Sequence, residues 1–175
     1  MLPIMTPIRL LTPADLEAYR ELRLLGLQES SMAFGSSYER ESVQDVEFFA
    51  KRIVANDDQW SCGAFDDGRL VGVVSFVRDG GDKMRHRGAL WGMYLHPDWR
   101  GQGIGRQLMI DMLTRTDALD GLRAVRLGVT DGNAAAEKLY ESLGFERYGS
   151  EPEVLCVDGR YYGEHYLSRT TGSNR

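Results

Sequence analysis

Three glycines at alternate positions form the stretch of the sequence best suited to binding chemistry. Gly101, Gly103 and Gly105 follow a segment that the apolar pattern predicts to be a strand, and they precede an amphipathic segment typical of a helix. Glycine lets the backbone approach a ligand closely, and the first turn of a helix has N–H groups without partners inside the helix. These groups and the helix dipole favour an anion such as a pyrophosphate. Arg100 and Arg106 would add charge-assisted hydrogen bonds to phosphate oxygens.

Two common nucleotide-binding patterns do not fit this glycine loop. The spacing Gly-x-Gly-x-Gly lacks the third-glycine position of the GxGxxG dinucleotide fingerprint, and the loop lies in the middle of the chain. A P-loop ends in Gly-Lys-Ser or Gly-Lys-Thr, whereas Gly105 is followed by Arg106 and Gln107. An isolated glycine cluster can also serve chain geometry alone, so a second motif is needed to assign its function.

The elements that must position this loop alternate between helical and strand-like patterns. Helices are predicted at 13–28, 42–55, from 104 onward and at 133–143, and strands at 8–11, 59–65, 70–77, 89–95, 122–129, 154–157 and 161–167. We therefore predict an α/β (α+β) fold with a central, mostly antiparallel mixed sheet of about six to seven strands flanked by helices. One domain is predicted over residues 5–168, followed by a polar C-terminal tail at 169–175.

Composition and charge argue against several classes of protein. The 175-residue chain has 21 basic and 26 acidic side chains, and the resulting net charge of −5 disfavours a nucleic-acid partner. The longest apolar stretches are far shorter than the ~20 residues needed to span a bilayer, so no membrane association is expected. Two cysteines and three histidines, all far apart in the sequence, predict neither a metal site nor a disulfide framework. We expect a cytoplasmic protein, monomeric or homodimeric, with no targeting segment at its N-terminus.

Two motifs resemble those of the GNAT superfamily of acetyl-CoA-dependent N-acetyltransferases. The run Arg-Gly-Gln-Gly-Ile-Gly at 100–105 resembles the family's coenzyme A pyrophosphate loop, and 93–97 looks like the strand before it. Residues 133–145 are similar to the family's Asn…Tyr helix with its Leu-Gly-Phe ending, and the hairpin at 157–166 looks like the closing strands. The motifs occur in the family's order and separation, within a resemblance that covers about residues 8–167.

The resemblance implies a GNAT-like fold and acetyl-CoA as the acetyl donor. Backbone groups of Met93, Tyr94 and Leu95 would pair with the pantetheine arm, and the glycine loop would hold the pyrophosphate. Asn133 would hydrogen-bond the cofactor, and the Tyr140 hydroxyl would face its sulfur. The implied cofactor-binding residues are Met93, Tyr94, Leu95, Arg100, Gly101, Gln102, Gly103, Ile104, Gly105, Arg106, Asn133 and Tyr140.

Helix geometry and acid–base chemistry support the positions of Asn133 and Tyr140. The two residues are seven apart, about two helical turns, so their side chains share a face. A departing thiolate needs a proton, and a tyrosine with a pKa of about 10 is protonated at neutral pH. Tyr140 is therefore the predicted catalytic acid. The alternatives are a helix-capping role for Asn133 and core packing of Tyr140 against Leu139 and Leu143.

The base that takes the proton of the acceptor amine is not identified by the sequence. Some relatives carry a glutamate on the strand before the glycine loop, but residues 88–95 include no carboxylate. The remaining alternatives are ordered water, His96, and the glutamates around the serine-rich loop, which are Glu29, Glu39 and Glu41.

The predicted function is direct transfer of the acetyl group of acetyl-CoA to a primary amine of a small molecule or peptide through a ternary complex. A covalent acetyl-enzyme is disfavoured because neither cysteine lies in an activating context. The loop at 29–38, with Phe34 and Tyr38, lies where family members build the acceptor pocket. A non-catalytic acyl-CoA-binding or sensor module and a nucleotide-binding regulator are the alternatives, and Tyr140 favours the enzyme.

Overall fold

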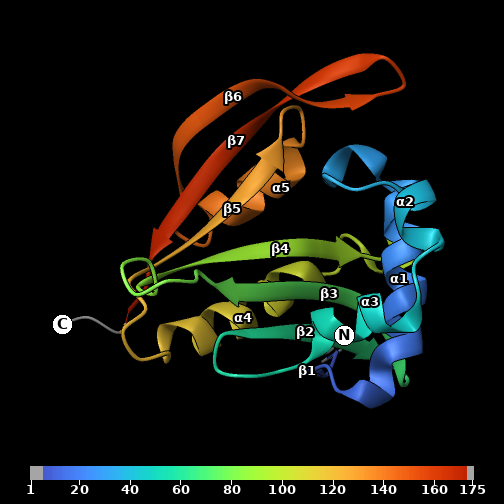
Figure 1. The fold of residues 1–175 in the computed structure, drawn as a ribbon, viewed down its shortest axis with the longest axis horizontal. Helices are drawn as coiled ribbons and strands as arrows, with labels where there is room; N and C mark the ends of the chain where they lie inside the picture. The colour runs from blue at the N-terminus through green and yellow to red at the C-terminus, as the bar shows by residue number, and fades with distance from the viewer. Residues whose placement is uncertain (1–5, 173–175) are drawn as a thin grey trace.

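A seven-stranded sheet forms the centre of the computed structural model, which describes residues 6–172 (Figure 1). The strands are β1 (Ile8–Leu10), β2 (Gln59–Asp66), β3 (Arg69–Arg78), β4 (Arg87–Leu95), β5 (Ala124–Thr130), β6 (Glu146–Val157) and β7 (Arg160–Thr170). Their spatial order is β1-β2-β3-β4-β5-β7-β6, and every neighbouring pair is antiparallel except the parallel pair β4 and β5. The predicted α/β (α+β) architecture with a mostly antiparallel mixed sheet is confirmed.

Helices cover both faces of the sheet. They are α1 (Leu16–Glu29), α2 (Tyr38–Ser42), α3 (Val46–Ile53), α4 (Ile104–Asp117) and α5 (Ala134–Glu141), with short 3-10 helices η1 (Pro13–Asp15), η2 (Ser31–Ala33) and η3 (Pro97–Trp99). Helices α4 and α5 pack on one face, where the predicted apolar stripe of Ile104, Leu108 and Met112 is buried. On the other face, α1 and α3 bury a second cluster that includes Tyr19 and Phe49.

Strands β4 and β5 separate soon after they begin to pair. Their ladder consists of Arg87 with Ala124, Gly88 with Val125 and Ala89 with Arg126. Beyond this ladder the two strands diverge, as Figure 1 shows, and residues 90–95 have no β5 partner within the described chain. The sheet therefore has an internal opening, with the last six residues of β4 along one side and the end of β5 along the other.

The helix predicted at 42–55 is wrong in its limits, because two capped helices occupy this region. The Ser37 hydroxyl accepts the N–H of Arg40 at the start of α2, and an Asp45 carboxylate oxygen accepts the N–H of Phe48 at 2.9 Å at the start of α3. Each capping side chain satisfies an N–H that has no partner inside its own helix. The cap at Asp45 begins a new helix inside the predicted one.

The closing hairpin is also longer than predicted, and the start of the predicted tail is a correction. Strand β7 continues to Thr170, which pairs with Ala124, and the Thr171 hydroxyl donates to the Leu122 carbonyl at 2.5 Å. Residues 169 and 170 thus belong to β7, and residue 171 is hydrogen-bonded to the chain just before β5, because strand pairing uses backbone groups and tolerates polar side chains. The predicted domain start at residue 5 and the tail residues 173–175 lie outside the described residues.

Candidate active site

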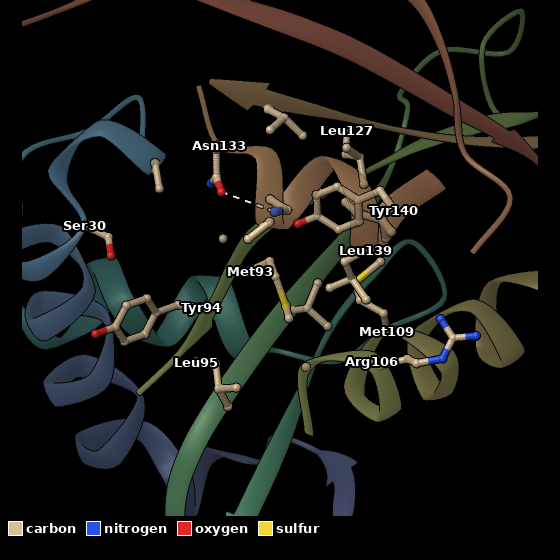
Figure 2. A pocket seen from close by; sticks show the side chains of 18 of the residues that line it. Ser30, Met93, Tyr94, Leu95, Arg106, Met109, Leu127, Asn133, Leu139 and Tyr140 are labelled. Carbon is tan, nitrogen blue, oxygen red and sulfur yellow. Dashed lines mark hydrogen bonds between the residues drawn. The ribbon is translucent and has the colours of Figure 1, made fainter. Parts of the chain in front are cut away.

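The opening between β4 and β5 forms a cavity of about 520 Å³ (Figure 2). It extends from the glycine loop and α4, past α5, to Ser30 and Ala33 at η2 on the other side of the sheet. Predicted site residues that line it are Met93, Tyr94, Leu95, Arg100, Gly101, Gly103, Gly105, Arg106, Asn133 and Tyr140. Two segments that lie about thirty residues apart in the sequence therefore meet at one cavity.

The glycine loop presents an uncovered backbone to this cavity. Gly101 and Gly103 have φ angles of 73° and 81°, a left-handed conformation that favours glycine, and a Cβ at either position would meet no atom within 4 Å. Gly103 caps α4, a helix of 14 residues whose first-turn N–H groups have no acceptor inside the helix. An open loop with free N–H groups at the positive end of a helix dipole fits a pyrophosphate.

The two arginines beside the loop have different surroundings. Arg100 donates to both carboxylate oxygens of Glu29, at 3.0 and 2.6 Å, and to the Leu95 carbonyl at 3.0 Å. Arg106 makes a single 2.8 Å hydrogen bond to the Ser142 hydroxyl. Arg106 thus makes fewer hydrogen bonds to the protein than Arg100, which links the loop to the end of α1. Phosphate binding by either side chain stays a prediction.

The free edge of β4 fits an extended ligand. Residues Met93, Tyr94 and Leu95 lie beyond the β4–β5 ladder and line the cavity, so the backbone groups on that side of β4 have no β5 partner. One of these groups, the Leu95 carbonyl, accepts the hydrogen bond from Arg100. An extended chain can pair with such an edge as an added strand does. The backbone role predicted for these three residues has the geometry it needs.

Asn133 and Tyr140 both reach the cavity, from the N-cap and the last turn of α5 (Figure 2). Asn133 also caps α5, the alternative role predicted for it, because its side-chain oxygen accepts a hydrogen bond from the N–H of Ala136 at 3.3 Å. The Tyr140 ring packs edge-on against Phe145 with 5.9 Å between centroids, and the residue is 7% exposed. Its hydroxyl makes no hydrogen bond to any group within residues 6–172. Desolvation by burial raises the Tyr140 pKa to about 12, so the phenol is protonated at neutral pH.

Two predicted cofactor-binding residues do not face the cavity with their side chains. The Gln102 amide donates to the Asp98 carbonyl at 3.0 Å, and Ile104 is buried in the core at 3% exposure. Any contact of these two residues with a ligand therefore uses their backbone groups, as the prediction for the loop requires.

Glu29 lies near the cavity but is poorly suited to act as a base. Hydrogen bonds from Arg100 lower its pKa to about 2, in spite of its desolvation, and the Tyr94 hydroxyl adds a hydrogen bond at 3.1 Å. A carboxylate this acidic accepts a proton weakly near neutral pH. Glu29 instead connects the end of α1 to β4 and the glycine loop.

The other candidates for a base also lie away from the cavity. Glu41 is fully buried in ion pairs with Arg23 and Arg52, at 2.8 and 2.9 Å. The His96 ring caps η3, and Glu39 borders a different cavity. The described side chains that line the β4–β5 cavity include no carboxylate and no imidazole.

The serine-rich loop borders a second cavity of about 610 Å³ between η2, α2 and the tip of the β6–β7 hairpin. Phe34 and Tyr38 both line it, as predicted for the walls of an acceptor pocket. The Thr130 hydroxyl donates to the Met32 carbonyl at 2.6 Å and holds η2 against the end of β5. The loop therefore lies beside the end of β5 and next to the β4–β5 cavity, which Ser30 and Ala33 also line.

Two further features limit the kind of site. Within residues 6–172, no group of three or more His, Cys, Asp or Glu side chains is arranged to hold a metal ion. No helix in this part of the chain is both long and apolar enough to cross a membrane.

Comparison with known proteins gives one family and several partial relatives. The model of the acetyltransferase (GNAT) family matches residues 24–145. An L-methionine sulfoximine/L-methionine sulfone acetyltransferase of Pseudomonas paraeruginosa is 38% identical over 69 residues, which are 39% of this chain and 40% of that protein. The L-amino acid N-acetyltransferase AaaT of Escherichia coli is 27% identical over 103 residues, 59% of this chain and 63% of that protein. The match thus spans less than two thirds of these curated relatives.

Solved structures show the same fold over nearly the whole chain. A GNAT superfamily phosphinothricin acetyltransferase from Sinorhizobium meliloti, in complex with acetyl-CoA, has a TM-score of 0.85 at 20% identity and covers 98% of this chain and 91% of its own. A GNAT-family acetyltransferase from Streptococcus pneumoniae has a TM-score of 0.82 at 23% identity, covering 94% and 98%.

The predicted family is confirmed. The family model extends over both the glycine loop and the helix that carries Tyr140, and the relatives are acetyltransferases. This chain belongs to the GNAT family of acetyltransferases, whose cosubstrate is acetyl-CoA.

Proposed function

We propose that this protein transfers the acetyl group of acetyl-CoA directly to the primary amine of a small molecule of the amino-acid class, through a ternary complex. The observation that carries the proposal is the Tyr140 hydroxyl, which lies in the β4–β5 cavity without a protein partner among the described residues. The acceptor class is supported by relatives named for L-methionine sulfoximine, L-amino acids and L-2,4-diaminobutyric acid.

In this proposal the protein orients the donor and supplies a proton. Acetyl-CoA brings a thioester whose carbonyl carbon is the electrophile. The N-terminus of α4 holds the pyrophosphate, and the free edge of β4 aligns the extended arm through backbone hydrogen bonds. The acceptor amine approaches from the side of η2. Holding both reactants in one cavity makes the transfer effectively unimolecular.

The Tyr140 hydroxyl donates its proton to the thiolate that leaves. A phenol with a pKa of about 12 is a weak acid, but the burial that raises this pKa also disfavours a thiolate in the same cavity. The transfer is therefore less uphill than the pKa values in water suggest. Since the hydroxyl has no competing acceptor among the described residues, it is free to point at the sulfur.

A coupled assay of free thiol release tests this function. Acetyl-CoA is incubated with the protein and a panel of L-amino acids, amino-acid analogues, polyamines and short peptides, and the products are identified by mass spectrometry. We expect saturable turnover with a subset of the amino-acid group and an N-acetylated product. Binding of acetyl-CoA without turnover of any amine would contradict the proposal and favour a sensor.

A further inference from the structure

One carboxylate on β7 faces the acceptor side of the sheet. Glu164 pairs directly with Thr130 of β5, and residues opposite each other in an antiparallel ladder have side chains on the same face. The Thr130 hydroxyl reaches the Met32 carbonyl of η2, so this face is the one that η2 covers. Glu164 is partly buried there and forms no ion pair with any Lys, Arg or His of the described chain.

The carboxyl group of Glu164 lies over the part of β5 that borders the cavity. A Cβ built on Gly128 would lie 2.7 Å from the Glu164 carboxyl carbon and would overlap one of its oxygens. Gly128 itself lines the cavity. The missing side chain at 128 therefore creates the space that the carboxylate occupies at the edge of the cavity.

Glu164 and Tyr140 belong to opposite faces of the sheet. Leu127 and Val129, the neighbours of Gly128, point into the core cluster that α5 and Tyr140 share. Gly128, between them, faces the other way, toward Glu164. The proton donor Tyr140 thus lines the cavity on the α5 face, and the carboxylate of Glu164 lies next to Gly128 on the η2 face, at the border of the cavity.

The charges around Glu164 favour a cation. Glu151 of β6 lies directly opposite it, and the Tyr166 hydroxyl donates to Glu151 at 2.8 Å. Like charges at opposite positions of a ladder are unfavourable unless a positive group lies between or near them. Helix η2 presents no titratable side chain here, and Glu29 beyond it is paired with Arg100. The Tyr166 hydroxyl faces Glu164 as well as Glu151. A protonated amine would be attracted to this position.

We propose that Glu164 binds the acceptor ammonium group and takes the proton whose loss frees the nitrogen lone pair for attack. This inference rests on the proposed function. The nitrogen lone pair attacks the thioester carbonyl carbon, the C–S bond breaks with its electron pair on sulfur, and Tyr140 protonates the thiolate. The nitrogen loses two protons in all: the first passes to Glu164 before attack, and the second leaves through solvent after the C–N bond forms and restores the Tyr140 hydroxyl. The products are the amide and free coenzyme A, and Glu164 releases its proton to water.

The substitution Glu164→Gln tests this role, because it keeps the size of the side chain and removes its basicity. With a primary amine that the wild-type protein acetylates, we expect kcat to fall by roughly 10²–10⁴-fold while the KM for acetyl-CoA stays within about twofold. For the variant, kcat/KM should rise about tenfold per pH unit below the pKa of the amine, since only neutral amine reacts. For the wild-type protein this slope should be much smaller. Glu146→Gln, an exposed glutamate at the start of β6, is the matched control and should retain the wild-type profile.

A second variant tests the geometry without changing Glu164. In Gly128→Ala the new methyl group displaces the flexible carboxylate, so kcat should fall at least tenfold with an unchanged melting temperature.

Wild-type kcat and pH slope in Glu164→Gln would overturn the inference while leaving the acetyltransferase function intact. A lower melting temperature with the wild-type pH slope would likewise overturn it, by showing a structural role. Absence of turnover by the wild-type protein with every amine would refute the proposed function, and this inference with it.

Discussion

The ring and the hydroxyl of Tyr140 have different roles in the protein. The ring is packed against Phe145, and the hydroxyl lies unpaired in the cavity. Tyr140→Phe retains the ring, so we expect the melting temperature to change little. Removal of the proton donor should lower kcat by roughly 10²–10⁴-fold. Steady-state kinetics and thermal melts measure the two effects separately.

The control for this variant is Tyr161→Phe, which removes a hydroxyl from a tyrosine that is 65% exposed on the hairpin. It should keep the wild-type kcat. Near-wild-type turnover of Tyr140→Phe in a single-turnover experiment would refute the general-acid role, because product release cannot mask the chemical step there.

Gly105 offers the cleanest test of the pyrophosphate position. Its φ is not left-handed, and a Cβ there would meet only side-chain ends, of Met93 at 3.4 Å and of Leu95 at 3.8 Å. Gly105→Glu should therefore fold and should weaken acetyl-CoA binding at least tenfold, about 1.4 kcal/mol, by placing negative charge beside the phosphates. Calorimetry on this variant and on Gly105→Gln, which has the same bulk without the charge, separates the two effects. Equal affinities for the two variants would contradict an anion site.

At the scale of elements, one buried carboxylate connects three helices. Glu41 of α2 accepts hydrogen bonds from Arg23 of α1 at 3.0 and 2.8 Å and from Arg52 of α3 at 2.9 Å. Glu41→Gln leaves two guanidinium groups without a counter-charge, and we expect the free energy of unfolding to fall by about 3–5 kcal/mol. Urea unfolding measures this, with exposed Glu39→Gln as a control expected within about 0.5 kcal/mol. An unchanged denaturation midpoint for Glu41→Gln would show that the network does not stabilise the fold.

The helices and strands with a strong hydrophobic periodicity were predictable from the sequence, but the elements against which they pack or pair were not. The stripe on α4 and the glycine C-cap after α5 are local patterns, so most of the predicted site residues do line the β4–β5 cavity. The sequence pattern suggested one continuous helix at 42–55, but α3 begins only after its N-cap Asp45. The capping hydrogen bond fixes the start of the helix more strongly than the weak hydrophobic periodicity before it. The proposed role of Glu164 was not predicted, because only the β5–β7 register places this residue over Gly128. Strand register is a long-range property that a single sequence does not contain.

For the molecule as a whole, three paired carboxylates predict sensitivity to acid. Hydrogen bonds from Arg9 lower the pKa of Asp15 to about 2, and those from Arg100 do the same for Glu29. Arg23 lowers that of Glu41 to about 2 against the desolvation of burial. In the unfolded chain these groups titrate near 4. Their contribution to stability is therefore fully present above about pH 5 and is lost progressively as the pH falls toward 2.

Thermal melts between pH 7 and pH 2 measure this effect. We expect a plateau near neutral pH and a steady fall of the melting temperature below about pH 5. Asp15→Asn should flatten part of that fall and lower the plateau, because its ion pair with Arg9 is absent at every pH. A melting temperature independent of pH in this range would contradict the contribution of these pairs.

Because the ladder between β4 and β5 is short, a ligand bound between these strands would stabilise the sheet itself. Strands β1–β4 and β5–β7 form two sub-sheets joined by three residue pairs, and the open edge beyond them is where an extended ligand can pair. The two sub-sheets are thus expected to behave as separate cooperative units, with those amides of residues 90–95 that point away from β3 among the first to exchange with deuterium. A bound ligand at this edge adds RT ln(1 + [L]/Kd) to the stability of the native state. Slower exchange along β4 would then report occupancy of the cavity directly, without any turnover.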